Sequence, residues 1–452
     1  MAKKMLFLVV LLFSLTGMLK AQVTTAGMSG KVMADEESVI GATVVAVHEP
    51  SGTSYGTVTN VDGRFSLQGM RSGGPYKVTV SYIGYQTAIY TGIQLQLGET
   101  YSLNVTLHEA SELLGEITIT ASKSKFSAEK TGATTNISSE QLTTLPSINR
   151  SISDFTRISP YASGNSFGGR DGRSNTFTVD GANMNNNFGL SSDLPGGGNP
   201  ISLDAIDEVQ VVIAPYDVRQ ANFIGAGINA ITKSGTNAYR GSAYMYFNNE
   251  VMRGNKIGDT DFGVRAEESK TVYGATLGGP IIKDKLFFFA NVEYEKSPQQ
   301  VITWRAAREG EDPNNSTISR TTEADLAEFS QILKDKYGYN TGSFTDFPAD
   351  VTNLKLLGRI DWNINQGNKL SVRYNFTNNK TWNAPNGSSG NTGYRLAYNR
   401  VSAYSMSYAN SCYSLQNIVN SATAELNSRF SSNVSNQLLF TYSDMKDERD
   451  TN

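Results

Sequence analysis

The second half of the chain alternates apolar and polar residues with a period of two. In residues 286–295 one side reads Leu, Phe, Ala, Val and Tyr, and the other reads Phe, Phe, Asn, Glu and Glu. This period predicts β-strands whose two faces meet different surroundings. The same pattern recurs at 240–248, 269–279, 355–365, 369–377, 420–430 and 434–443. We therefore expect seven strands in this half.

The connections between these stretches alternate in length. The short ones lie at 280–285, 366–368 and 431–433, and the long ones at 249–268, 297–353 and 379–419. A soluble, half-buried sheet also alternates in polarity. Outer-membrane barrels, however, combine strands of about nine to eleven residues with short periplasmic turns and long extracellular loops. The phasing predicts that 238–452 is the N-terminal part of a transmembrane antiparallel β-barrel, whose outer face contacts outer-membrane lipid.

Charged residues of both signs lie within these strands. An arginine that faces lipid near the bilayer midplane costs about 2–4 kcal/mol, whereas the lumen offers water or protein groups. We therefore expect four of them to face the lumen, namely Glu293, Arg359, Asp361 and Arg373.

Seven strands cannot close such a barrel. Bacterial single-chain barrels have even strand numbers, and barrels with a plugged lumen have about 22 strands. We expect this chain to hold about seven of them and to end in a loop after Tyr442.

The long connection 297–353 contains a predicted helix at 323–337. Thr322 is placed to cap its first turn, and an apolar stripe follows the helical period. We expect this stripe to pack on the loop itself. Its members are Leu326, Phe329, Leu333 and Tyr337.

The first part of the chain predicts a small all-β domain. Short strand-forming runs lie at 40–47, 56–61, 64–67, 76–83 and 101–107. Asp62-Gly63 predicts a hairpin between two of them, and the set favours a β-sandwich. Gly30-Lys31-Val32, 40–44, 59–65 and 82–85 resemble the carboxypeptidase regulatory-like domain. That resemblance implies a domain at 22–110 without catalytic residues, of the kind that often leads TonB-dependent receptors of Bacteroides-type bacteria.

Residues 130–237 have a mixed α/β pattern. Short helices are expected at 138–145 and 151–158, and strands at 176–181 and 206–212, with polar loops at 164–175 and 181–198. The second strand leads to a glycine-containing stretch at 224–235. The strand 177–181, the strand 205–211 and the glycine-rich stretch 225–235 resemble the plug domain of TonB-dependent receptors, in its Oar-type branch. The motif residues that carry this resemblance are Val179, Asp180, Gly181, Gly225, Gly227 and Asn229.

A short strand-forming segment precedes this unit, within a linker at 111–129. It is followed by polar residues and has no obvious partner, so it could add itself to the open sheet edge of another protein. The segment resembles the TonB box, which implies contact with the energy-coupling protein TonB. The alternative is that 113–120 is the last strand of the preceding domain. The residues of the segment are Glu116, Ile117, Thr118, Ile119, Thr120 and Ala121.

The first 21 residues predict a secretory signal peptide. Lys3 and Lys4 precede an apolar run at 5–15, and Ala21 offers a small residue for cleavage. The alternative is a membrane anchor, but about eleven apolar residues are too few to cross about 30 Å of hydrocarbon. We expect the protein to leave the cytoplasm and to reside in the outer membrane.

The remaining chemistry argues against an enzyme. The formal net charge of −3 gives no general attraction to nucleic acid. His48 and His108 are the two histidines, and Cys412 is the single cysteine, so no internal disulfide can form. We therefore expect no catalytic residue, no metal and no cofactor.

The resemblances together imply a receptor that imports an unidentified large ligand. TonB and an extracellular ligand would be its partners, and a surface lipoprotein partner is left open. The alternative function is a surface adhesin that binds its ligand without transport.

Overall fold

Three units follow one another along the chain. The computed structural model describes residues 23–34, 36–109, 117–120, 133–147, 150–185, 194, 199–215, 220, 223–261, 263, 268–298, 301–302, 304–312, 318–347, 350–384 and 404–451. Residues 23–109 form the N-terminal sandwich, residues 133–232 form the central unit, and residues 240–451 form the seven-stranded sheet with its connections. The expected signal peptide lies outside the described residues.

The N-terminal sandwich consists of two facing sheets with an apolar core between them. Buried and exposed residues alternate along its strands, as in β5, and the buried sides meet around residues such as Met28, Val44 and Leu67. The first sheet holds β1 (Ala26–Ala34), β2 (Glu37–Ser38), β5 (Arg64–Met70), β8 (Thr100–Ser102) and β9 (Val105–Leu107). The second sheet has the order β10 (Ile117–Thr120), β7 (Ala88–Leu95), β6 (Gly73–Ser81), β3 (Thr43–His48) and β4 (Thr53–Val58).

The hairpin expected at Asp62-Gly63 was wrong. The turn itself is present, since Gly63 has a φ of 70° and its N–H donates to the Asn60 carbonyl at 2.9 Å. However, β4 pairs with β3 and β5 pairs with β1, so the turn carries the chain from one sheet to the other. A turn signal fixes a local reversal of the chain but does not choose the strand's partner.

The central unit is a five-stranded sheet with two short helices. The predicted helices are confirmed as α2 (Ser139–Thr144) and α3 (Ile152–Thr156). The sheet has the order β11 (Ala133–Ser138), β16 (Ile206–Ala214), β17 (Gly227–Thr232), β14 (Thr176–Val179) and β15 (Ala182–Asn183). Its remaining elements are β12 (Ala162–Ser163), β13 (Ser166–Phe167), η1 (Gly172–Ser174) and η2 (Leu203–Ala205).

Seven antiparallel strands form the last unit, in the order of the sequence. All seven predicted strands are confirmed, and each pairs with its neighbours along the chain. The strands are β18 (Arg240–Asn249), β21 (Ser269–Ile282), β22 (Leu286–Lys296), β25 (Thr352–Asn363), β26 (Asn368–Asn383), β27 (Tyr413–Arg429) and β28 (Ser435–Thr451). Short elements lie in the long connections: η3 (Glu250–Met252), β19 (Lys256–Ile257), β20 (Thr260–Asp261), β23 (Arg305–Ala307), β24 (Ile318–Thr322) and η4 (Ala409–Ser411).

Two expectations about strand length are corrected. The later strands are longer than nine to eleven residues, since β27 and β28 have 17 each. Seventeen residues extend roughly 55 Å, so these strands continue beyond the apolar layer of a membrane as a polar ribbon. The chain does not enter a loop after Tyr442, because residues 443–451 belong to β28 and pair with 413–421.

The helix in the second long connection is confirmed as α4 (Glu323–Tyr337). The Asp325 N–H donates to the Thr322 hydroxyl at 3.1 Å, which makes Thr322 the N-cap. The expected packing of its stripe was wrong in part. Leu326 is buried, but Phe329 and Tyr337 are exposed, and the Phe329 ring lies 6.3 Å from the Tyr408 ring. Among the described residues, no helix is both long and apolar enough to cross a membrane.

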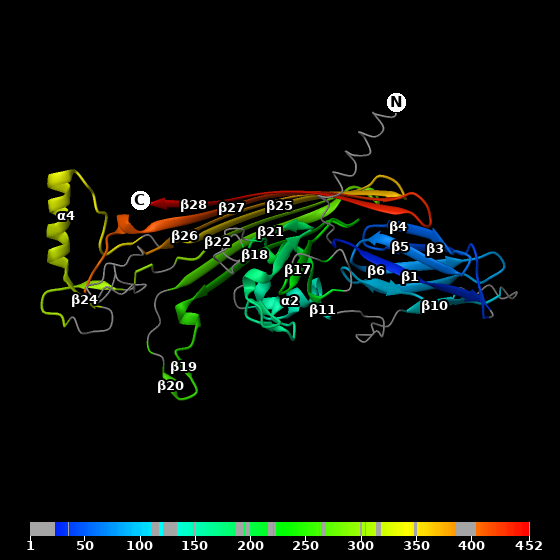
Figure 1. The fold of residues 1–452 in the computed structure, drawn as a ribbon, viewed down its shortest axis with the longest axis horizontal. Helices are drawn as coiled ribbons and strands as arrows, with labels where there is room; N and C mark the ends of the chain where they lie inside the picture. The colour runs from blue at the N-terminus through cyan, green and yellow to red at the C-terminus, as the bar shows by residue number, and fades with distance from the viewer. Residues whose placement is uncertain are drawn as a thin grey trace, which may run out of the picture.

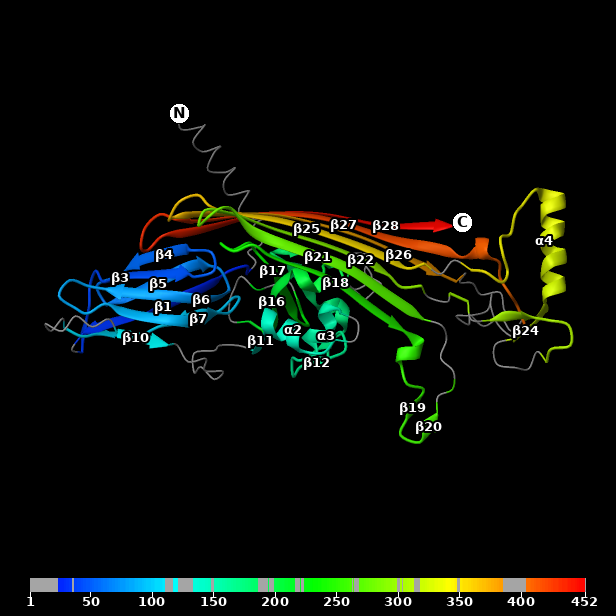
Figure 2. The same cartoon turned by 180° about the vertical axis from the view of Figure 1, so that it is seen from behind.

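The seven-stranded sheet curves over the other two units (Figures 1 and 2). The central unit lies under its middle, and the N-terminal sandwich lies under the end with the short turns. Strand β24 and helix α4 lie at the opposite end, where the long connections are. The two ends therefore differ in what they carry: a folded domain at one and extended loops at the other.

Candidate functional site

A buried carboxylate joins the central unit to the seven-stranded sheet. Asp180, directly after β14, accepts hydrogen bonds from the Thr232 N–H at 2.9 Å and the Thr232 hydroxyl at 2.6 Å. Two arginines of the sheet approach it, Arg359 at 3.7 Å and Arg373 at 3.4 Å. Asp180 has a φ of 43°, and Gly181 follows with 79°. These contacts hold the Val-Asp-Gly turn in a left-handed conformation that only a few residue types adopt.

A second buried group fixes the other side of the central unit. Lys355 and Glu293, on neighbouring strands of the sheet, form an ion pair at 2.9 Å with both side chains almost fully buried. The second oxygen of Glu293 accepts from the Ser202 hydroxyl and the Tyr244 hydroxyl, each at 2.9 Å. Arg150 of the central unit lies 3.7 Å from the same carboxylate. The central unit is thus held to the sheet by two charged clusters rather than by an apolar seam alone.

The structure places the four residues expected in the lumen on the face that meets the central unit. Glu293, Asp361 and Arg373 are buried there, and Arg359 is half-buried. The apolar residues that alternate with them, such as Ile360 and Val372, are exposed on the opposite face. This is the arrangement expected of a sheet with lipid on one side.

The N-terminal sandwich contacts both other units through Arg71, which follows β5. The Arg71 guanidinium donates to the Ser234 hydroxyl at 2.9 Å and lies 3.4 Å from Asp361. Its backbone is held by two buried tyrosines, because Arg71 N–H donates to the Tyr55 hydroxyl and the Tyr76 hydroxyl donates to the Arg71 carbonyl. Burial raises the pKa of both phenols. They therefore stay neutral and keep these hydrogen bonds.

A second contact lies at the turn between β7 and β8. The Leu97 N–H donates to both oxygens of Glu208 at 3.1 Å, and the Gln210 amide donates to the Leu97 carbonyl at 2.5 Å. The Leu97 side chain is fully buried in a small cluster with Val23 and Ile231. The turn between β7 and β8 therefore contacts β16 of the central unit through the backbone N–H and carbonyl of Leu97.

Side-chain amides extend this contact across the central sheet. The Asn229 amide donates to the Gln210 carbonyl oxygen at 3.3 Å, and the Thr178 hydroxyl donates to the Asn229 carbonyl oxygen at 2.8 Å. Thr178 lies one residue before Val179, which pairs with Ala230 in the parallel β14–β17 ladder. The Val-Asp-Gly strand is thus linked to the sandwich through Asn229 and Gln210.

Two glycines of the motif lie where a side chain would collide with a neighbour. A Cβ at Gly225 would overlap the Asn175 side-chain oxygen, and one at Gly227 would lie 2.7 Å from the Phe223 ring. The side chains of Asn175 and Phe223 pack directly against the backbone of these glycines, which explains why neither position carries a side chain.

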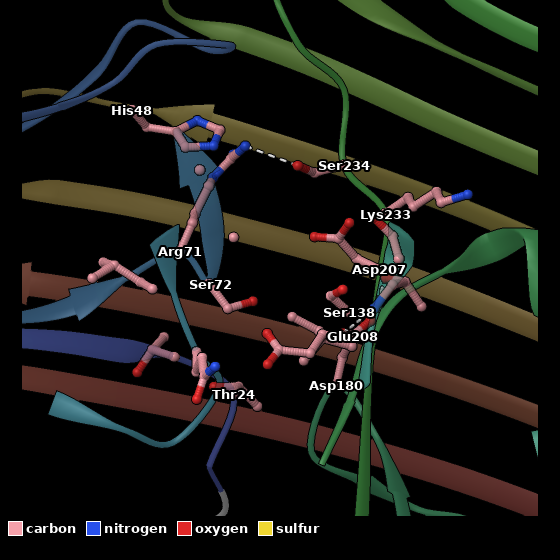
Figure 3. A pocket seen from close by; sticks show the side chains of 18 of the residues that line it. Thr24, His48, Arg71, Ser72, Ser138, Asp180, Asp207, Glu208, Lys233 and Ser234 are labelled. Carbon is pink, nitrogen blue, oxygen red and sulfur yellow. Dashed lines mark hydrogen bonds between the residues drawn. The ribbon is translucent and has the colours of Figure 1, made fainter. Parts of the chain in front are cut away.

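A cavity of about 1650 Å³ lies where the three units meet. Figure 3 shows Arg71 reaching from the sandwich to Ser234, with Asp180, Asp207 and Glu208 on the side of the central unit. Burial raises the pKa of Glu208 to about 8, and burial together with the Arg71 charge lowers the pKa of His48 to about 3. Among the described residues, no group of three or more His, Cys, Asp or Glu side chains could hold a metal ion.

Part of the segment expected to contact TonB is described. Ile117–Thr120 form β10, which pairs in parallel with residues 88–91 of β7 at the edge of the sandwich. Glu116 and Ala121 lie outside the described residues. The backbone of the segment therefore completes a sheet of the preceding domain, which is the alternative that the sequence left open.

Two known protein domain families match this chain, one near each end. Residues 27–108 match the carboxypeptidase regulatory-like domain, and residues 231–452 match an outer membrane beta barrel domain. The TonB-dependent transporter Oar of Myxococcus xanthus is 25% identical over 343 residues, which are 72% of this chain and 30% of that relative. These findings support a TonB-dependent receptor with an N-terminal carboxypeptidase regulatory-like domain. The chain spans about 30% of the length of this relative.

Solved structures of outer-membrane proteins resemble the receptor at low identity. The siderophore receptor PirA of Pseudomonas aeruginosa has a TM-score of 0.43 and 14% identity, over 71% of this chain and 42% of that chain. The outer membrane transporter YddB of Escherichia coli has a TM-score of 0.45 and 12% identity, over 70% and 39%.

The comparisons confirm the fold class and the location of the protein. It is mainly β, with an N-terminal sandwich and part of a barrel, and it belongs to the outer membrane. The named relatives are transporters or receptors, not enzymes. Sequence reasoning missed Arg71, Leu97, Glu208 and Lys355, because no local pattern marks a residue whose partner is far along the chain.

Proposed function

We propose that the receptor imports a large ligand into the periplasm, with the central unit as its plug and TonB acting on residues 116–121. One observation carries the proposal. The central unit is fixed to the inner face of the seven-stranded sheet by the clusters at Asp180 and Glu293. The segment lies immediately before this unit in the chain, so a pull on it loads the unit directly.

The first strand after the segment is suited to such a pull. Strand β11 lies at the edge of the central sheet and pairs antiparallel with β16, starting from Ala133 opposite Ala214. A force that arrives through residues 121–132 reaches Ala133 first. The force would separate the residue pairs between β11 and β16 one after another rather than all at once. The central unit would then open from this edge of its sheet.

The test is binding of the isolated periplasmic domain of TonB to the full receptor. Deleting 116–121 should abolish binding, whereas a matched deletion of 124–129 in the same linker should retain it. Equal binding by both variants and the parent would contradict the proposal. Absence of binding in the parent as well would favour the surface adhesin, which has no need of TonB.

A further inference from the structure

The N-terminal sandwich is fastened across the short-turn end of the seven-stranded sheet. We call the contacts of Arg71 with Ser234 and Asp361 the Arg71 latch. The contacts of Leu97 with Glu208 and Gln210 are the Leu97 latch. The Arg71 latch binds the seven-stranded sheet and its junction with the central unit, and the Leu97 latch binds the central unit itself.

Further contacts bring the sandwich against the short turns. The Asn237 N–H donates to the Pro50 carbonyl at 2.8 Å, and the Asn363 amide donates to the Thr53 hydroxyl at 3.0 Å. The Gln437 amide donates to the Thr24 hydroxyl at 2.8 Å. In a receptor whose short turns face the periplasm, the sandwich therefore lies across the route by which a ligand would leave.

The sandwich can separate without losing its own core. Its apolar cluster consists of residues from its two sheets alone, and the central unit has a separate cluster that it shares with the seven-stranded sheet. Among the described residues, the sandwich and the central unit share only the small apolar cluster of Val23, Leu97 and Ile231. Hydrogen bonds and an ion pair around the cavity hold the rest of the boundary. The boundary therefore has the properties of a separable domain contact.

The segment at 116–121 is connected to both units, so it loads both when it is pulled. Strand β10 pairs with β7 at residues 88–91, and β7 continues to Leu95 and directly into the turn that carries Leu97. The central unit shares a large apolar cluster with the seven-stranded sheet, whereas the small cluster of Val23, Leu97 and Ile231 joins it to the sandwich. Parting the sandwich therefore exposes less apolar surface, so the boundary of the sandwich yields before the central unit.

We propose that the N-terminal sandwich is a second gate, closed by the Arg71 and Leu97 latches and released by a pull on residues 116–121 before the central unit opens. This inference rests on the proposed function, because it takes the segment as the point of pulling. It gives the domain a task in transport: it covers the exit while the receptor is at rest.

Single-molecule pulling on the full receptor in a membrane tests the order of release, and it needs neither TonB nor a ligand. With the tether attached at residue 121, the first event should be release of the sandwich. Arg71→Ala should lower the force of that event at least about twofold and leave later events unchanged. The matched control is Arg64→Ala, since Arg64 begins β5, the strand that Arg71 follows, and is exposed. A first event that Arg71→Ala does not change would overturn the proposal.

Thiol labelling of the purified full receptor tests whether the gate is closed at rest. In a Cys412→Ser background, Leu97→Cys should react with a maleimide at least about tenfold more slowly than in the same protein with Arg71→Ala. Thr53→Cys, which is close to isosteric, gives an independent probe if Leu97→Cys fails to fold. Val80→Cys, inside the sandwich core, should stay unreactive in both. Equal rates at residues 53 and 97 with and without Arg71 would refute the latch, whereas the TonB-binding experiment alone decides the proposed function.

Discussion

Replacing Asp180 by Asn should loosen the central unit from the seven-stranded sheet. Asn keeps the size of the side chain and tolerates the left-handed backbone at this position. It removes the negative charge that lies 3.4 Å from Arg373 and 3.7 Å from Arg359. Arg359 retains Asp361 at 3.0 Å. Arg373 is 3% exposed, and Asp180 is its only ion-pair partner among the described residues.

The size of the effect follows from the loss at Arg373, because Arg359 keeps another carboxylate and Arg373 does not. Removing one partner of a buried ion pair and leaving the other buried costs about 3–5 kcal/mol. If that energy is lost from the local stability of the central unit, its amides should exchange with solvent at least about a hundredfold faster. The amides of β17, which pairs with the strand preceding Asp180, report this opening most directly.

Hydrogen exchange of the full receptor in detergent or bilayer is the assay. Asp204→Asn is the matched control, because Asp204 is more exposed and its partner Arg150 keeps Glu293 nearby. This pair is only partly buried, and Arg150 keeps a second carboxylate, Glu293, so exchange should rise less than about tenfold. If Asp180→Asn accelerated exchange of β17 less than about threefold, the buried-charge reasoning would be refuted.

Two further predictions test the boundary of the sandwich and the facing of the strands. Burial raises the pKa of Glu208 from 4.5 to about 8, so the docked state keeps a proton that the undocked state has lost. Docking should therefore weaken as the pH rises from about 4.5 to about 8, by at most about tenfold per unit. Docking would be measured from the distance between spin labels on the sandwich and on the seven-stranded sheet. Glu208→Gln should abolish the pH dependence of docking. A pH dependence that persists in this variant would assign it to another group, such as the neighbouring Asp207. Separately, Ile360→Arg on the exposed face should destabilise the protein folded in a bilayer by about 2–4 kcal/mol, while Ile360→Leu should not. Equal stabilities of the two variants would mean that this face does not contact lipid.

The seven strands could be predicted because the two sides of a membrane-spanning sheet meet different solvents. The same reasoning failed at the outer ends of β27 and β28. Residues 443–451 are almost entirely polar and exposed on both sides, so their alternation carries no signal. Their strand geometry comes from pairing with 413–421. Which strand a segment pairs with is part of the tertiary structure, and the local sequence does not show it.

The motif residues of the central unit could also be located from sequence, but their partners could not. Asp180 follows a recognisable strand, yet the residues that satisfy it lie at 232, 359 and 373. Arg71 follows an ordinary strand of the sandwich, and its counter-ion is 290 positions away at Asp361. Local patterns predict elements, whereas contacts between domains depend on how the elements are arranged.

The cavity between the three units affects how easily they move. A volume of about 1650 Å³ has room for roughly fifty water molecules, and charged side chains from all three units line it. The surfaces that line the cavity are therefore open to water in the closed receptor. When the units part, little apolar surface becomes newly wetted, and water already present can replace the latch hydrogen bonds. The hydration of this boundary allows repeated opening and closing without exposure of an adhesive apolar face to the periplasm.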